Sequence, residues 1–91
     1  MPSKSAHIGD PVGLHLRAAS RIVQLAKKFP CEVRIQYEDI ETNAKSILGL
    51  ASLVARHKAL VTLTTEGEQE DEALDALVHL IEIGLAEDSP Q

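Results

Sequence analysis

Apolar and polar positions alternate in some parts of the chain and recur every three or four residues in others. Val33 and Ile35 alternate with Glu32 and Arg34, a pattern that predicts a strand buried on one face. Between residues 19 and 26, apolar side chains recur at the i, i+3, i+4, i+7 spacing of an amphipathic helix. With turn formers as boundaries, the same two criteria predict strands at 4–8, 31–37, 40–44 and 60–65, and helices at 16–28, 46–54 and 68–84.

The two later helices are expected to bury different stripes of side chains. In the short helix, the side chains expected to face the core are Leu50, Leu53 and Val54. In the last helix, the expected buried stripe consists of Leu74, Leu77, Val78, Leu80 and Ile81. Gly84 is expected to end that helix, because glycine is the usual residue just beyond a helix C-terminus, and residues 86–91 are expected to form a frayed tail.

These elements follow one another in the order βαββαβα. We expect the four strands to form one mainly antiparallel sheet with the helices on one face, which is an α+β open-faced β-sandwich. No internal repeat, linker or low-complexity segment interrupts the chain. Residues 1–91 are therefore expected to form a single domain.

Composition argues against several classes of protein. The formal net charge of −5 does not suit a general nucleic-acid binder, which needs a basic face, and Phe29 and Tyr37 are the only aromatic residues for base stacking. No apolar run approaches the ~20 residues of a membrane span. The first residues lack the apolar segment of a secretory signal, and the single cysteine, Cys31, suits a reducing compartment. We expect a cytoplasmic monomer that neither binds nucleic acid nor inserts into a membrane.

The candidate chemistry lies at the start of the first predicted helix. Asp10, Pro11 and Gly13 are turn formers, so the helix cannot begin much before His15. The first N–H groups of a helix lack internal partners, and the helix dipole makes that end positive. With Arg17 in the first turn, this end is suited to hold a phosphoryl group on His15. Taken alone, a histidine near a helix start is more often a polar cap or a surface residue.

Three segments of the chain favour the phosphoryl site, because they resemble segments of one protein family and follow in the same order. The segment Gly13-Leu14-His15-Leu16-Arg17-Ala18-Ala19-Ser20 resembles the active-site segment of HPr, the histidine-containing phosphocarrier protein of the bacterial phosphotransferase system. Residues 43–50, Asn-Ala-Lys-Ser-Ile-Leu-Gly-Leu, resemble that family's regulatory serine segment, and residues 66–74 resemble the start of its last helix. The resemblance extends from Pro11 to about Gly84. It implies an HPr-like fold and a carrier that is not itself an enzyme.

The resemblance also implies partners and roles. His15 would accept a phosphoryl group from phosphorylated enzyme I, charged by phosphoenolpyruvate, and pass it to an enzyme IIA-type protein. The attacking nitrogen must be unprotonated, and both the helix N-terminus and Arg17 disfavour the imidazolium form. Arg17 would stabilise the bound phosphate. Ser46, a good helix N-cap, would also be a regulatory site for an HPr kinase/phosphorylase and could attract a transcriptional regulator.

A basic and partly apolar surface around His15 is the expected docking site for acidic partners. The residues assigned to it are Leu16, Ser20, Arg21, Gln24, Lys27, Lys45, Ile47, Leu48 and Ala51. No metal or other cofactor is expected, because His7, His57 and His79 are far apart in sequence and lack metal-ligand spacing. No Ser–His–Asp set, glycine-rich phosphate loop or carboxylate pair indicates an independent enzyme.

Two departures and two alternatives stay open at this point. The family often has proline where this chain has Ala18, which restores an amide donor and loses some rigidity. The first strand is less β-branched and less apolar than the family's. The chain could serve sugar uptake, as residues 45–49 suggest, or a nitrogen-related regulatory branch, as residues 83–88 suggest. It could also be a regulatory binding module that passes no phosphate, although members of that kind lack the histidine.

Overall fold

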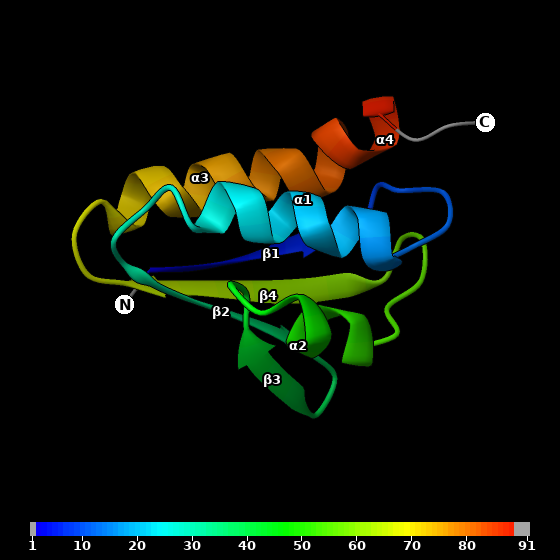
Figure 1. The fold of residues 1–91 in the computed structure, drawn as a ribbon, viewed down its shortest axis with the longest axis horizontal. Helices are drawn as coiled ribbons and strands as arrows, with labels where there is room; N and C mark the ends of the chain where they lie inside the picture. The colour runs from blue at the N-terminus through cyan, green and yellow to red at the C-terminus, as the bar shows by residue number, and fades with distance from the viewer. Residues whose placement is uncertain (1, 89–91) are drawn as a thin grey trace.

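The computed structural model describes residues 2–88. Its strands are β1 (Ser3–His7), β2 (Glu32–Tyr37), β3 (Ile40–Asn43) and β4 (Leu60–Glu66). Its helices are α1 (Leu16–Ala26), α2 (Ile47–Ser52), α3 (Glu70–His79) and α4 (Leu85–Asp88), with a π-helical segment, η1 (Leu80–Gly84), between the last two. The predicted order βαββαβα is confirmed, and α1 begins at the expected residue (Figure 1).

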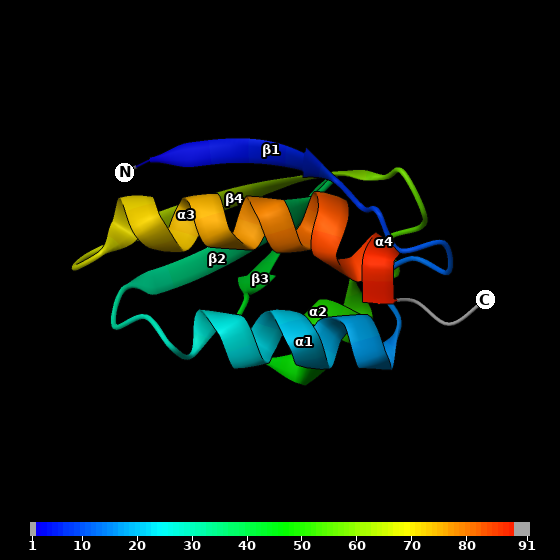
Figure 2. The same cartoon turned by 90° about the horizontal axis from the view of Figure 1, so that it is seen from above.

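The four strands form one sheet in the order β1-β4-β2-β3, and every pairing is antiparallel. All helices cover the same face of this sheet, with α1 and α3 lying side by side and α2 beside α1 (Figures 1 and 2). The register brings apolar side chains together beneath the helices, because Ala6 pairs with Val61 and Ile35 with Leu63. These four side chains are fully buried in the core. The predicted α+β open-faced β-sandwich is confirmed.

Two predicted helix ends were wrong. Gly84 does not end the last helix, which continues through η1 into α4, so Ala86 to Asp88 are helical and residues 89–91 lie outside the described part. A Cβ at Gly84 would come 2.9 Å from Leu80 Cδ1, so this glycine permits close packing inside the helix, and the buried Leu85 holds the extension to the core. Val54 does not face the core: α2 ends at Ser52, and Val54 is 72% exposed with a positive φ of 52°.

The π-helical segment holds the loop that follows β1. Gly9 donates its N–H to the carbonyl of Ile81 at 2.9 Å. A Cβ at Gly9 would lie 2.2 Å from the carbonyl oxygen of Glu82, so only glycine allows this approach. The start of the loop that leads to His15 is therefore positioned by the far end of the chain. No helix among the described residues is long and apolar enough to cross a membrane.

Candidate functional site

His15 is the N-cap residue of α1 and has an extended backbone with φ −80° and ψ 178°. Its side chain does not cap the helix, and within the described residues the N–H groups of Leu16, Arg17 and Ala18 have no acceptor. The His15 side chain is 30% exposed, so the ring is held by the protein and still reachable from solvent. The predicted combination of an accessible imidazole and open helix N–H groups is present.

The loop before His15 is held against the segment between α2 and β4. Gly13 donates to the carbonyl of Asp10 at 3.0 Å, and Leu14 donates to the carbonyl of Ala55 at 2.8 Å. Gly13 has a φ of +92°, and a Cβ there would lie 2.6 Å from the Ala55 oxygen. The turn therefore requires glycine for both its backbone conformation and this close contact. It fixes the angle at which α1 presents His15.

Asp10 is a site residue that the sequence analysis missed, because there it counted only as a turn former. Its carboxylate is 4% exposed, and Oδ2 lies 3.1 Å from Nε2 of His15. The other oxygen, Oδ1, accepts the N–H of Val12 at 2.8 Å. The Asp10–Val12 spacing is that of an Asx turn, which is a sequence signal for the second bond. The bond to His15 depends on how the whole turn folds.

His57 is a second missed residue. Its Nδ1 lies 3.0 Å from the carbonyl oxygen of Asp10, so it donates to the backbone of the turn that carries the carboxylate. Residues 10 and 57 are far apart in sequence, and no local pattern predicts this bond. Arg56 and Lys58, on either side of His57, are exposed. The segment between α2 and β4 therefore adds basic residues to the His15 end of the molecule.

The contact with Asp10 assigns the tautomer of His15. An ionised carboxylate can only accept a hydrogen bond, so Nε2 carries the proton and donates it to Asp10. In the neutral ring, the lone pair is then on Nδ1. From the sequence, only the helix end and Arg17 were expected to influence this histidine. The structure adds a carboxylate against its other nitrogen.

Arg17 lies in the first turn of α1, two residues after His15, and its side chain is exposed. In the part of the chain that the structure describes, it makes no hydrogen bond or ion pair. Its guanidinium is therefore available for an anion at the start of the helix. Ala18, where a proline was expected from the family, is buried and adds one of the three open N–H groups.

The residues predicted to dock partners fall into groups with different environments. Leu16 is 65% exposed, Leu48 is 83% exposed and Ile47 is 37% exposed. Gln24 and Lys27 are also exposed, whereas Ser20, Arg21 and Ala51 are half-buried. Val12 and Val54, which the docking prediction left out, are also exposed apolar side chains.

The flank of α1 opposite α2 carries a separate shallow depression. Its lining consists of Arg21, Gln24, Leu25, Lys28 and Leu80. Arg21 and Gln24 therefore line the side of α1 that faces η1, whereas Ile47, Leu48 and Ala51 belong to α2 on its other side (Figure 1). The predicted docking residues do not all share one flank of the helix.

Ser46 and Lys45 both have structural roles. Ser46 is the N-cap of α2, and its Oγ accepts the N–H of Gly49 at 3.1 Å, as expected. The ammonium of Lys45 donates to the carbonyls of Phe29 and Cys31, at 2.8 Å each. This half-buried cation therefore joins the segment after α1 to the start of α2. It is less available to an acidic partner than the docking prediction assumed.

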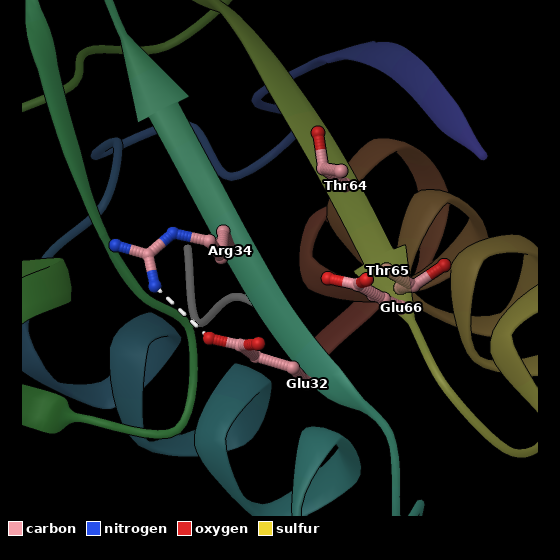
Figure 3. Close-up of a pocket in the computed structure, with 5 residues that line it drawn as sticks. All are labelled: Glu32, Arg34, Thr64, Thr65 and Glu66. Atoms are coloured by element: carbon pink, nitrogen blue, oxygen red, sulfur yellow. Dashed lines mark hydrogen bonds and ion pairs between the residues drawn. The ribbon is translucent and has the colours of Figure 1, made fainter. Parts of the chain in front are cut away.

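The open face of the sheet carries a second polar cluster, shown in Figure 3. Arg34 donates from Nε to Glu41 at 2.9 Å and from Nη1 to Glu32 at 3.2 Å. The hydrogen bond that Arg34 donates to Glu41 and the charge of that carboxylate, followed by the same two effects of Glu32, raise the pKa of Arg34 above its usual value. A small hollow here is lined by Glu32, Arg34, Thr64, Thr65 and Glu66. Among residues 2–88, no three His, Cys, Asp or Glu side chains come together to hold a metal ion.

Comparison with known proteins gives consistent matches over nearly the whole chain. Residues 2–82 match the family described as "PTS HPr component phosphorylation site". The phosphocarrier protein HPr of Pseudomonas aeruginosa is 44% identical over 82 residues, which cover 89% of this chain and 91% of that protein. The HPr-like protein Crh of Halalkalibacterium halodurans is 40% identical over 82 residues, covering 90% of this chain and 98% of that protein.

Solved structures agree with these matches. HPr-C-His from Thermoanaerobacter tengcongensis has a TM-score of 0.90 at 39% identity, covering 97% of this chain and 99% of that one. An HPr dimer from the same organism has a TM-score of 0.73 at 39% identity, covering 93% of this chain and 98% of that one. The resemblance read from the three sequence segments is confirmed.

Proposed function

Because the chain belongs to the HPr family, the phosphocarrier proteins of the bacterial phosphotransferase system, we propose that His15 is the residue that carries the phosphoryl group. The donor would be phosphorylated enzyme I, charged by phosphoenolpyruvate, and the acceptor an enzyme IIA-type domain. Both reactions would take place in the cytoplasm. One observation supports this most directly: the partly exposed imidazole of His15 stands at a helix N-terminus whose first N–H groups are open.

The transfer uses groups that are already in place. The Nδ1 lone pair of His15 attacks the phosphorus of the donor, the new N–P bond forms, and the bond to the donor's leaving atom breaks with its electron pair going to the donor. The open N–H groups of Leu16 and Ala18 and the guanidinium of Arg17 then stabilise the phosphate oxygens. The His15 side chain is 30% exposed, so a partner can reach it, which suits a group that must be passed on.

The docking surface that we propose centres on the exposed apolar side chains of α1 and α2. Leu16 and Leu48 are the most exposed of these, and Ile47 adds to them. Ser20, Lys27 and Ala51 accompany them, and the chain's acidic partners would meet the cations around His15. Arg21 and Gln24 belong to the other flank of α1, so a partner that contacts them must extend across the helix.

We also propose that Ser46 is a regulatory site that an HPr kinase/phosphorylase phosphorylates, and that a transcriptional regulator binds the phosphorylated form. Its position at the N-terminus of α2 accepts negative charge, because the dipole of the helix favours an anion there. The match to the HPr-like protein Crh shows that the chain also has relatives that carry a different name.

Intact mass after incubation with phosphoenolpyruvate and purified enzyme I tests the proposal. Enzyme I from the sugar branch and from the nitrogen branch are used in parallel, so that the branch is identified by which one charges the chain. The expected result is one acid-labile phosphoryl group, as a phosphoramidate is. If neither enzyme I charges the chain, it is the alternative, a binding module that passes no phosphate. Light scattering on the same samples tests the expected monomer against a dimer.

A further inference from the structure

We propose that Asp10 is the positioning residue that selects Nδ1 of His15 as the nucleophilic nitrogen. This inference rests on the proposed function, because it concerns which atom of His15 receives the phosphoryl group. It assigns a role in phosphoryl transfer to a carboxylate outside the Gly13–Ser20 segment. The carboxylate acts through the ring and does not touch the reacting phosphorus.

The orientation of the Asp10 carboxylate is set by the surrounding backbone. Oδ1 accepts the N–H of Val12 at 2.8 Å, which leaves Oδ2 directed at Nε2 of His15, 3.1 Å away. The carbonyl oxygen of Asp10 accepts from His57 Nδ1 and from the N–H of Gly13, both at 3.0 Å. With the side chain only 4% exposed, water competes little for the contact with His15. The carboxylate is therefore held rigidly at one nitrogen of the ring.

This arrangement prepares the ring for attack without a proton transfer. Nε2 already holds the proton, so Nδ1 can form the N–P bond while the donor's bond breaks and its electron pair returns to the donor. The ring that results is cationic, with phosphorus on Nδ1 and hydrogen on Nε2. The Asp10 carboxylate offsets that charge through the same hydrogen bond. In the return step, loss of the phosphoryl group restores the original tautomer.

The variant Asp10→Asn tests the role sharply. The amide oxygen of the new side chain is expected to keep the Val12 N–H bond, which directs the amide NH₂ at Nε2 of His15. Two donors cannot bond to each other, so Nε2 must become the acceptor and the proton must move to Nδ1. A carboxylate-to-amide change that imposes the wrong tautomer on a catalytic histidine costs roughly 10⁴ in rate in a serine protease. Here we expect charging by enzyme I and phosphoenolpyruvate to slow at least about tenfold.

Two readouts are needed, and one does not involve phosphate. Long-range ¹H–¹⁵N spectra of His15 in the isolated full chain report the tautomer, and initial rates of charging report the function. We expect Nε2–H in the wild type and Nδ1–H in Asp10→Asn. The matched control is Asp39→Asn, which removes the same charge from the exposed turn between β2 and β3 and should change neither readout.

Each outcome has a defined meaning. A wild type with Nδ1–H overturns the proposal without any variant, even if Asp10→Asn fails to fold. A variant that keeps the wild-type tautomer, or that switches it and charges at the wild-type rate, also overturns it. If enzyme I does not charge the wild type at all, the proposed function fails. The tautomer of His15 is measured without enzyme I, so that result still decides whether Asp10 sets the tautomer.

Discussion

Two arginines of this chain, Arg17 and Arg34, illustrate how the same side chain serves different purposes at two ends of the fold. Arg34, on the open face of the sheet, is hydrogen-bonded to Glu41. It is also bonded to Glu32, as Figure 3 shows. Arg17, in the first turn of α1, has no hydrogen bond or ion pair within residues 2–88. The open face balances its own charge, whereas the helix end keeps unsatisfied donors. An incoming phosphate would find partners only at the second place.

The carboxylates at the two places differ in the same way. Glu32 and Glu41 are exposed and neutralise an arginine on the surface. Asp10 is buried and engages one nitrogen of the ring that we propose as the nucleophile. Surface ion pairs are worth little and are screened by salt, but a buried hydrogen bond can fix a proton. Local burial, more than residue type, separates a structural pair from a functional one.

The largest effect that we expect is from His15→Ala. This change removes the imidazole that lies at the N-terminus of α1 beside Arg17, so charging by enzyme I should be abolished. Intact mass before and after acid treatment measures it. The matched control is His79→Ala, because His79 is exposed and lies at the end of α3. Wild-type phosphorylation of His15→Ala would place the phosphate elsewhere in the chain.

The next largest effect is the difference in charging rate between Arg17→Glu and Arg34→Glu. Both change the charge by two, but only Arg17 can reach a phosphate on His15. Loss of a charged hydrogen bond to the phosphate should slow charging by Arg17→Glu at least about tenfold. Arg34→Glu should charge at close to the wild-type rate, because its lost partners are two carboxylates on the other face. Equal slowing of the two variants would show that the effect is one of bulk charge.

A smaller, severalfold slowing is expected for Ser46→Asp. Aspartate caps a helix about as well as serine, so the circular dichroism spectrum and melting temperature should change little. The added charge should still oppose an acidic enzyme I. Ser46→Ala is the control in the opposite direction: it should lower stability by about 1 kcal/mol, because the bond to Gly49 is lost, while charging stays at the wild-type rate. Wild-type charging of Ser46→Asp would leave Ser46 with its capping role alone.

The smallest effect on charging is expected for Lys45→Met. Its ammonium bonds to the carbonyls of Phe29 and Cys31, so its loss should lower the free energy of unfolding by about 1–3 kcal/mol and leave the charging rate unchanged. Urea unfolding and initial rates measure the two quantities. Lys27→Met changes an exposed position, so it should leave the free energy of unfolding unchanged and slow charging by weakening docking. If Lys45→Met slows charging as much as Lys27→Met, Lys45 contacts the partner, as the sequence predicted.

Most of the fold could be predicted from the order of apolar positions. Alternation in 31–37 and 60–65 and the helical stripe in 19–26 are local patterns, and each corresponds to an element of the structure. The last helix was predicted to end at Gly84, because glycine there looks like a stop when only its neighbours are considered. Its actual role, close packing against Leu80, and the burial of Leu85 depend on contacts with the rest of the core.

The candidate site divides in the same way. By itself, the sequence determined that His15 begins a helix, that Arg17 follows in its first turn and that Ser46 caps another, because turn formers and capping residues act within a few positions. Only the tertiary structure decided that Asp10 meets Nε2 of His15 and that His57 supports the carbonyl of Asp10. It also decided that Lys45 is tied to the end of α1. These bonds need segments far apart in sequence to be brought together by burial of a shared core, and no local pattern records that.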